Sequence, residues 1–165
     1  MAGPRQGKRT KGDAKGARIL IVEARFYDDI ADALLAGAMK SLKEANATVD
    51  CISVPGSLEI PPAIAIALDA ARRKRRAYDA AVGLGCVIRG DTFHFEVVAT
   101  ESARGISRVA LEHGVPVANA VLTTDNEAQA RERIDEKGRE AARVAVEMAN
   151  LMWSLEDGGE DDGAQ

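Results

Sequence analysis

Strand-like and helix-like patterns alternate along most of this 165-residue chain. Four short runs are strand-like, and two of them, at 19–22 and 80–84, are apolar at consecutive positions, which is typical of strands that are buried on both faces of a sheet. Four longer segments repeat apolar residues at every third or fourth position, which predicts helices with one buried face. The predicted strands cover residues 18–24, 48–54, 79–88 and 117–122, and the predicted long helices cover 27–45, 60 to about 76, 95–113 and 138 to about 153.

Several residues indicate where the predicted helices begin or end. Pro61 and Pro62 fall where the first turn of a helix tolerates proline, and Gly114 marks the end of the helix before it. Thr124 and Glu127 have the spacing of a capping box, which predicts a short additional helix after the fourth strand.

The chain has the length of one ordinary domain. Because a helix separates each strand from the next, consecutive strands need crossover connections and must run parallel. The pattern therefore predicts a flavodoxin-like α/β fold, a three-layer α/β/α sandwich around a four-stranded parallel sheet. The domain is expected to span residues 18–153, between a disordered basic tail at 1–17 and a disordered acidic tail at 154–165.

The amino-acid composition limits the kinds of partner that the protein is expected to bind. Hydrophobic residues make up 46% of the chain and aromatic residues only 4%, so any aromatic side chain near a loop is notable. No apolar run approaches the roughly 18 residues of a membrane span. The net charge is -4, and the basic tail lacks the interleaved aromatic residues that stack on single-stranded nucleic acid. We expect a cytoplasmic protein with neither a membrane nor a nucleic-acid partner.

The two cysteines, Cys51 and Cys86, occur in or at the end of apolar, strand-like runs. They lack the C-x-x-C spacing of zinc or redox motifs. Both are therefore expected to be reduced, buried thiols, and no metal site is expected.

Side chains that could bind a ligand or transfer a proton lie in the loops that follow the predicted strands. Phe26 comes after the first strand, Glu59 after the second, and a glycine-containing turn up to His94 after the third. Open parallel sheets bind ligands at the carboxyl ends of their strands. The sequence thus predicts that these residues meet at one edge of the sheet.

The turn after the third strand reads R-G-D-T-F-H and opens a helix. Backbone N–H groups at Asp91 and Thr92 lack intrahelical partners there, which favours an anion such as phosphate. Histidine is the side chain whose ordinary pKa lies nearest neutrality, so His94 suits proton transfer. An ordinary helix cap and a packed histidine are the alternative interpretations.

Other side chains also have two interpretations. Phe26 is suited to stack on a flat heterocycle, and Glu59 either accepts hydrogen bonds from a polyol or complements a helix dipole. Arg133 either binds phosphate in a bidentate manner or is a solvated helix residue. His113 and the basic cluster at 72–76 are interpreted as helix-end residues that interact with terminal carbonyl groups and solvent.

Five separate segments, in this order, resemble the 6,7-dimethyl-8-ribityllumazine synthase family, which catalyses the penultimate step of riboflavin synthesis. The resemblance covers residues from about 18 to 153. The segments are E-A-R-F-Y-D-D-I (23–30), V-P-G-S-L-E-I-P (54–61), G-C-V-I-R-G-D-T-F-H-F-E (85–96), V-L-T-T-D-N-E-A-Q-A-R-E-R (121–133) and V-E-M-A-N-L (146–151).

The resemblance implies that 5-amino-6-(D-ribitylamino)uracil condenses with 3,4-dihydroxy-2-butanone 4-phosphate, without a metal or redox cofactor. It implies a site shared between adjacent chains of a homopentamer, which some members assemble further into a hollow shell. His94 would transfer protons, and Asp91, Thr92 and a neighbouring chain's Arg133 would bind the phosphate. The ribitylaminouracil would contact Phe26, Ser57, Leu58, Glu59, Cys86, Val87, Ile88 and Asn119.

The chain differs from common family members at Tyr27, Leu58 and Asn119, and its linker at 134–137 is shorter, with Lys137 as a candidate phosphate contact. These differences motivate an alternative, a riboflavin- or lumazine-binding protein with weakened catalysis on the same scaffold. The charged tails motivate a third hypothesis, a compartment or interaction protein.

Overall fold

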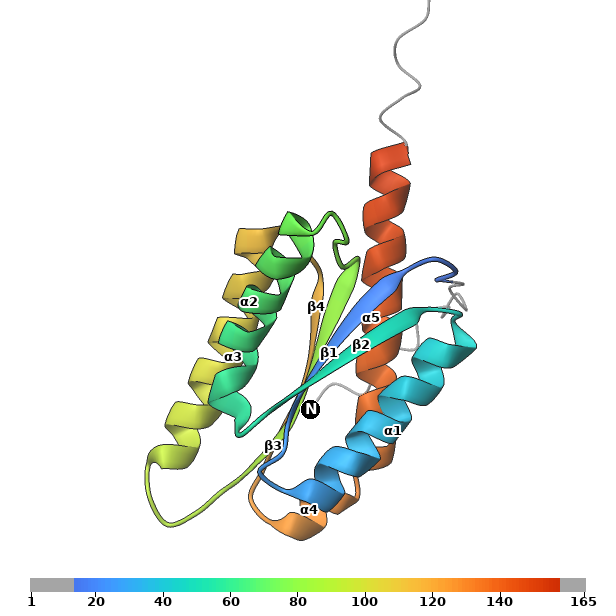
Figure 1. Cartoon of the computed structure of the whole chain (residues 1–165). Coiled ribbons are helices and arrows are strands. Elements are labelled where there is room, and N and C mark those ends of the chain that lie inside the picture. The colour runs from blue at the N-terminus through green and yellow to red at the C-terminus, as the bar shows by residue number, and fades with distance from the viewer. Residues whose placement is uncertain (1–13, 158–165) are drawn as a thin grey trace, which may run out of the picture.

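The structure is a computed structural model that describes residues 14–157. Within this range, strands and helices alternate as the hydrophobic pattern predicts (Figure 1). In chain order the elements are β1 (Arg18–Ala24), α1 (Asp28–Glu44), β2 (Thr48–Val54), the 3-10 turn η1 (Ser57–Glu59), α2 (Ile60–Arg73), β3 (Ala80–Ile88), α3 (His94–His113), β4 (Val117–Thr124), α4 (Glu127–Arg131) and α5 (Ile134–Asp157).

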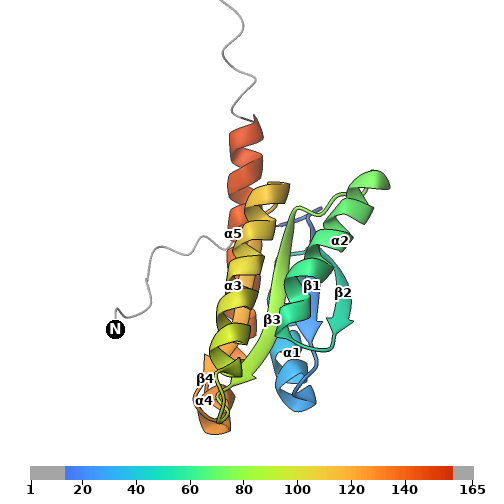
Figure 2. The same ribbon diagram turned by 90° about the vertical axis from the view of Figure 1, so that its left-hand side faces the viewer.

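The sheet of the described chain has the strand order β2-β1-β3-β4, and every neighbouring pair is parallel. In the centre, Ile21 of β1 pairs with Cys51 of β2 on one side and Val82 of β3 on the other. Helices α1 and α5 cover one face of the sheet, and α2 and α3 cover the other (Figures 1 and 2). The predicted flavodoxin-like α/β/α sandwich with a parallel sheet is confirmed.

Two apolar cores lie on either side of this sheet. Successive side chains of β1 point to opposite faces, so Ile19 and Ile21 pack with Leu34 of α1 in one core. Leu20 and Val22 are fully buried in the other core, which α2 and α3 cover. Each such side chain contributes roughly 1.5–3 kcal/mol on burial, which is why consecutive apolar residues mark these strands.

Helix α5 lies close against α1 because of a glycine. A Cβ atom at Gly138 would overlap the backbone carbonyl oxygen of Leu34, so no larger residue fits without moving one helix. The close approach lets Ala142 and Ala145 of α5 enter the same core as α1.

Polar contacts join the amino ends of the strands to the last helix. The backbone N–H of Arg18 donates to Asp79 at 2.7 Å, and the indole N–H of Trp153 donates to the same carboxylate at 3.2 Å. The Arg18 guanidinium also pairs with Asp50 and lies 4.2 Å from the centre of the Tyr78 ring. These contacts therefore tie together the amino ends of the strands with the last helix.

The structure changes several predicted boundaries. Helix α5 begins at Ile134, because this side chain packs against the core, so residues 134–137 are helical rather than a linker. The same helix continues to Asp157, which makes residues 154–157 helical rather than part of a tail. Before β1, Ala14 and Ala17 are fully buried against the domain. The remaining parts of the expected tails, 1–13 and 158–165, lie outside the described residues.

The cap of α4 also differs from the predicted one. The Asn126 side chain, not that of Thr124, accepts the hydrogen bond from the backbone N–H of Gln129, at 3.0 Å. The Thr124 hydroxyl is buried at the end of β4 and donates to the Asn126 carbonyl oxygen instead.

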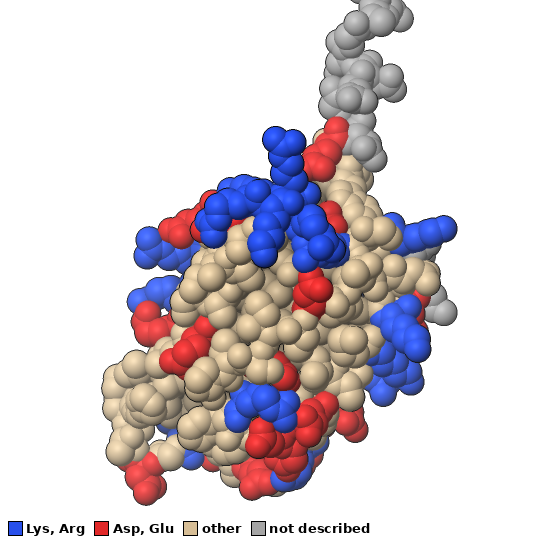
Figure 3. All heavy atoms as spheres, in the orientation of Figure 1, with Lys and Arg blue, Asp and Glu red and all other residues tan. Residues whose placement is uncertain are grey.

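Cys86 is a free, buried thiol as expected, whereas Cys51 is exposed. The prediction for Cys51 was wrong because β2 lies at the edge of the sheet, where no further element of the described chain covers it. Of the five basic residues at 72–76, the first two end α2 at Arg73, three residues before the predicted end, and the other three follow the helix; all five are exposed, as expected for a solvated helix end. Figure 3 shows lysine and arginine side chains gathered at this end of the molecule.

Candidate active site

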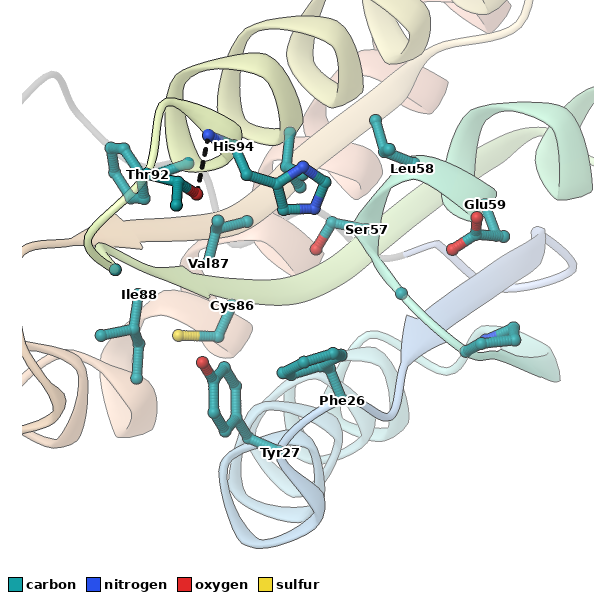
Figure 4. Close-up of a pocket in the computed structure, with 15 residues that line it drawn as sticks. Phe26, Tyr27, Ser57, Leu58, Glu59, Cys86, Val87, Ile88, Thr92 and His94 are labelled. Atoms are coloured by element: carbon teal, nitrogen blue, oxygen red, sulfur yellow. Dashed lines mark hydrogen bonds between the residues drawn. The ribbon is translucent and has the colours of Figure 1, made fainter.

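A pocket of about 400 Å³ lies at the carboxyl ends of the strands. Loops after β1, β2 and β3, together with the start of α3, form its walls (Figure 4). This edge is where open parallel sheets bind ligands. The pocket is lined by Phe26, Tyr27, Pro55, Gly56, Ser57, Leu58, Glu59, Cys86, Val87, Ile88, Gly90, Thr92, His94, Phe95 and Val98.

The floor of the pocket is the end of β3 and the 3-10 turn η1 that packs on it. A Cβ atom at Gly85 would lie 2.8 Å from the Ser57 hydroxyl oxygen, so the absence of a side chain at Gly85 lets η1 sit directly on the strand. Ser57 is only 5% exposed, whereas Leu58 and Glu59 beside it are exposed. The turn therefore presents a fixed hydroxyl and an accessible carboxylate to the pocket.

Aromatic rings from the loop after β1 form a second wall. Phe26 is 72% exposed, and its ring meets that of Tyr27 edge to face, with centroids 5.0 Å apart. The loop is anchored by Arg25, which donates to Glu23 at 3.2 Å and to Asp32 at 2.8 Å. An exposed ring on an anchored loop is suited to stack on a planar ligand.

Two weakly acidic groups also line the pocket. Burial raises the pKa of the Cys86 thiol to about 11, so this sulfur stays protonated at neutral pH. Because the thiolate is the nucleophilic form, Cys86 supplies a small, neutral surface rather than an attacking group. Burial, and then the neighbouring Cys86 and Glu127, raise the pKa of Tyr27, whose hydroxyl points toward Cys86 (Figure 4).

The turn after β3 leads directly into the first turn of α3. The backbone N–H of His94 donates to the Thr92 hydroxyl at 3.4 Å, and the imidazole ring points into the pocket on the Ser57 side (Figure 4). Residues 89–94 are all exposed, so the backbone of this turn is accessible to a ligand. The amino end of α3, a 20-residue helix, favours negative charge at this position.

The pocket brings together nine of the predicted site residues. They are Phe26, Ser57, Leu58, Glu59, Cys86, Val87, Ile88, Thr92 and His94.

Four other candidates lie outside the pocket of their own chain. Asp91 is exposed in the turn itself, and Asn119 lies on β4, where its side chain accepts from the Val121 N–H at 2.9 Å. Arg133 is exposed between α4 and α5 and donates to the Gln129 carbonyl at 2.7 Å. Lys137 pairs with Glu140, one turn along α5, at 3.4 Å. Their expected substrate contacts stay predictions.

The pocket also contains residues that were not among the predicted site residues. Tyr27 adjoins Phe26 in sequence, and Pro55 and Gly56 immediately precede Ser57. Phe95 and Val98 follow His94 at the start of α3, and the spacing of four residues between His94 and Val98 places them on one helix face. That helical spacing was the available signal for Val98.

Among residues 14–157, no three histidine, cysteine or acidic side chains come together as metal ligands would. No helix in the same range is long and apolar enough to cross a membrane.

Comparison with known proteins assigns the chain to a family. Residues 16–153 match the family model described as 6,7-dimethyl-8-ribityllumazine synthase. The 6,7-dimethyl-8-ribityllumazine synthase of Afipia carboxidovorans is 53% identical over 160 residues, which cover 94% of this chain and 98% of the relative. The protein of the same name from Nitrobacter hamburgensis is 54% identical over 87% of this chain and 90% of the relative. The one from Rhodopseudomonas palustris is 50% identical over 96% of this chain and 100% of the relative. The chain therefore belongs to the 6,7-dimethyl-8-ribityllumazine synthase family.

Proposed function

We propose that this chain condenses 5-amino-6-(D-ribitylamino)uracil with 3,4-dihydroxy-2-butanone 4-phosphate to form 6,7-dimethyl-8-ribityllumazine. The chain is an enzyme of riboflavin biosynthesis, a transferase, as its family membership establishes. The observation that carries the proposal is the pocket itself. It combines an exposed aromatic ring, a polar turn, an anion-favouring helix start and His94 in one cavity.

The ribitylaminouracil fits one half of the pocket by its chemistry. Its flat pyrimidine stacks on Phe26, while its edge hydrogen-bonds to the backbone at the end of β3, between Cys86 and Ile88. The ribityl hydroxyls reach the polar turn, where Ser57 is fixed and the Glu59 carboxylate is accessible. A polyol donates hydrogen bonds to such a carboxylate, and charged acceptors make the stronger bonds.

The phosphorylated substrate fits the other half. Backbone N–H groups of the turn at 90–92 and the positive end of α3 receive its phosphate. Arg133 of an adjacent chain adds a bidentate cationic partner. Its exposed position, outside its own pocket, supports a role across a boundary between chains.

His94 moves protons between the two reactants. Schiff-base formation and elimination of phosphate both require proton transfer, and an imidazole within the cavity is suited to it. Holding two reactants side by side supplies a further large part of the rate. The condensation releases phosphate and water without any change of oxidation state that would need a redox cofactor.

A homopentamer completes this proposal, because a ring of identical head-to-tail contacts places each Arg133 beside the next chain's pocket. Large apolar side chains on α2 and α3 support association, since Ile66 is 69% and Leu111 is 85% exposed in the single chain. The cytoplasmic location stays a prediction, which fractionation of cells tests.

The test is turnover of both substrates by the purified full-length chain, followed by the fluorescence of the lumazine. The chain has two histidines, which provide a matched pair of variants. His94→Ala is expected to lower kcat while most substrate affinity survives. His113→Asn should leave turnover unchanged, because His113 ends α3 beside Asp69, away from the pocket.

No product at high enzyme concentration would end the proposal. Tight riboflavin binding without turnover would instead select the binding-protein alternative. That alternative is not favoured, because the relatives with 50–54% identity are named as synthases and His94 lies in the pocket.

A further inference from the structure

Arg89 holds a position beside the pocket that the substrate contacts above do not explain. It directly follows β3, and its Nε donates to the Asp125 carboxylate at 2.8 Å. One of its terminal nitrogens donates to Glu96 in the first turn of α3, and the guanidinium lies 4.2 Å from the centre of the Phe95 ring. One planar group therefore links three segments: the end of β3, the end of β4 and the start of α3.

The turn that Arg89 spans has few other contacts. Residues 89–94 are all exposed, and a Cβ atom at Gly90 would meet nothing within 4 Å. The hydrogen bond between the Thr92 hydroxyl and the His94 N–H is long, at 3.4 Å. The Arg89–Glu96 pair bridges both ends of this turn, so it restrains a segment that packing does not.

The backbone at Asp125 is held at the start of α4, which gives its exposed carboxylate a fixed origin. Its backbone N–H donates to the Gln129 side chain at 2.9 Å, and the next residue, Asn126, caps α4. The backbone N–H of Arg89 also donates to the Thr124 carbonyl at 2.9 Å. Arg89 thereby connects the exposed turn at 89–94 to the hydrogen-bonded segment between β4 and α4.

We propose that Arg89 is a positioning residue whose pairing with Glu96 and Asp125 holds the phosphate-binding turn and His94 in their working geometry. This inference rests on the proposed function. It assigns Arg89 no contact with substrate, because the guanidinium is occupied by two carboxylates and an aromatic face and does not line the pocket.

The charges around Arg89 favour this role over direct binding of phosphate. Two carboxylates face one guanidinium, so the cluster has no spare positive charge for an anion. The pKa of Glu96 lies below its ordinary value, chiefly because Arg89 donates a hydrogen bond to it, so the pair stays ionised at neutral pH. Exposed ion pairs are individually weak, but a guanidinium fixed by two carboxylates and a stacked ring has a defined orientation.

The test compares Arg89→Met, Arg89→Lys and the double variant Glu96→Gln/Asp125→Asn in the full-length chain. Arg89→Met should raise the KM for the butanone phosphate about tenfold and lower kcat/KM by about 10- to 100-fold, as expected for displaced binding and catalytic groups. The KM for the ribitylaminouracil should change less than about twofold, because its half of the pocket does not depend on this turn. Arg89→Lys should restore only part of the loss, because an ammonium cannot bridge two carboxylates while stacking on Phe95.

The double variant separates positioning from direct binding. If Arg89 acts through its partners, Glu96→Gln/Asp125→Asn should reproduce the Arg89→Met defect, and combining all three changes should add little. If Arg89 contacts the phosphate instead, removing the carboxylates frees the guanidinium, and the KM for the butanone phosphate stays unchanged or falls. An unchanged or lower KM for the butanone phosphate in the double variant overturns the inference.

Amide hydrogen exchange at His94 and Val97, whose N–H groups donate to Thr92 and Phe93 at 3.4 Å, provides a readout that does not need turnover. Exchange should be faster in Arg89→Met and in the double variant than in the original chain. Arg104→Met is the matched control, because Arg104 makes a single exposed pair with Glu101 further along α3, at 2.9 Å. Unchanged exchange in Arg89→Met overturns the inference, whereas an original chain without turnover contradicts only the proposed function.

Discussion

Replacing Gly85 with alanine should impair the ribityl half of the pocket without unfolding the domain. The added Cβ atom would lie 2.8 Å from the Ser57 hydroxyl oxygen, whereas ordinary contacts begin at 3.4 Å. To reach an ordinary contact distance, Ser57 must therefore move by about 0.6 Å. This displacement exceeds the roughly 0.5 Å within which a binding group has to be held. A displacement of 1 Å can lower the rate of an enzyme by roughly 100-fold. For this smaller displacement we expect the KM for the ribitylaminouracil to rise about tenfold.

Gly83→Ala is the matched control for this substitution. Gly83 lies two residues earlier on the same face of β3, and a Cβ atom there would lie 2.9 Å from Ile60 Cγ2 rather than from Ser57. Both variants should lose about 1–3 kcal/mol of unfolding free energy through overpacking.

The assay is steady-state kinetics with each substrate varied in turn, at a temperature where thermal unfolding curves show both variants folded. Only Gly85→Ala should raise the KM for the ribitylaminouracil. Equal kinetic defects in the two variants, or an unchanged KM in a folded Gly85→Ala protein, would refute the placement of Ser57 in the ribityl site.

Three further predictions concern stability. Trp153→Phe removes the hydrogen bond to Asp79 and should lower the unfolding free energy by about 1 kcal/mol in denaturant titrations, with turnover unchanged. The pKa of Asp50 is lowered first by the Tyr78 hydroxyl, so Asp50 stabilises the fold above its unfolded pKa and this contribution is lost as pH falls through the folded value. Asp50→Asn should therefore make unfolding free energy less dependent on pH below about 5, and an unchanged slope would contradict that assignment. Gly138→Ala should destabilise the chain by at least about 1–3 kcal/mol through contact with the α1 backbone, despite the better helix propensity of alanine; a stabilised variant would show that α5 can move away.

The strands and most helices could be predicted because their apolar residues repeat with the period of the element that they form. The start of α5 could not, because Ile134 is the only apolar residue in a polar segment and its burial depends on the distant core. The exposure of Cys51 depends on strand order, since a strand at the edge and one in the centre can have the same local pattern. At α4, Thr124 and Asn126 both resemble caps, and burial of Thr124 at the end of β4 decides between them.

The site was predictable where a residue lies within a few positions after a strand, since parallel strands bring their carboxyl ends to one edge. Phe26, Glu59 and His94 all line the pocket for this reason. Contacts between segments distant in sequence could not be predicted in the same way. Arg89 and Asp125 are 36 residues apart, and no local pattern connects them.

The central claim, that His94 of one chain and Arg133 of its neighbour serve the same pocket, is tested most directly by mixing two variants of lowered activity. His94→Ala and Arg133→Ala chains with different tags are co-expressed, and assemblies that contain both are purified and assayed for lumazine formation. Random arrangement in a ring should place an intact histidine beside an intact arginine at about a quarter of the sites. The account predicts recovery toward about a quarter of normal activity. Activity that stays at the mean of the two separate variants would contradict it.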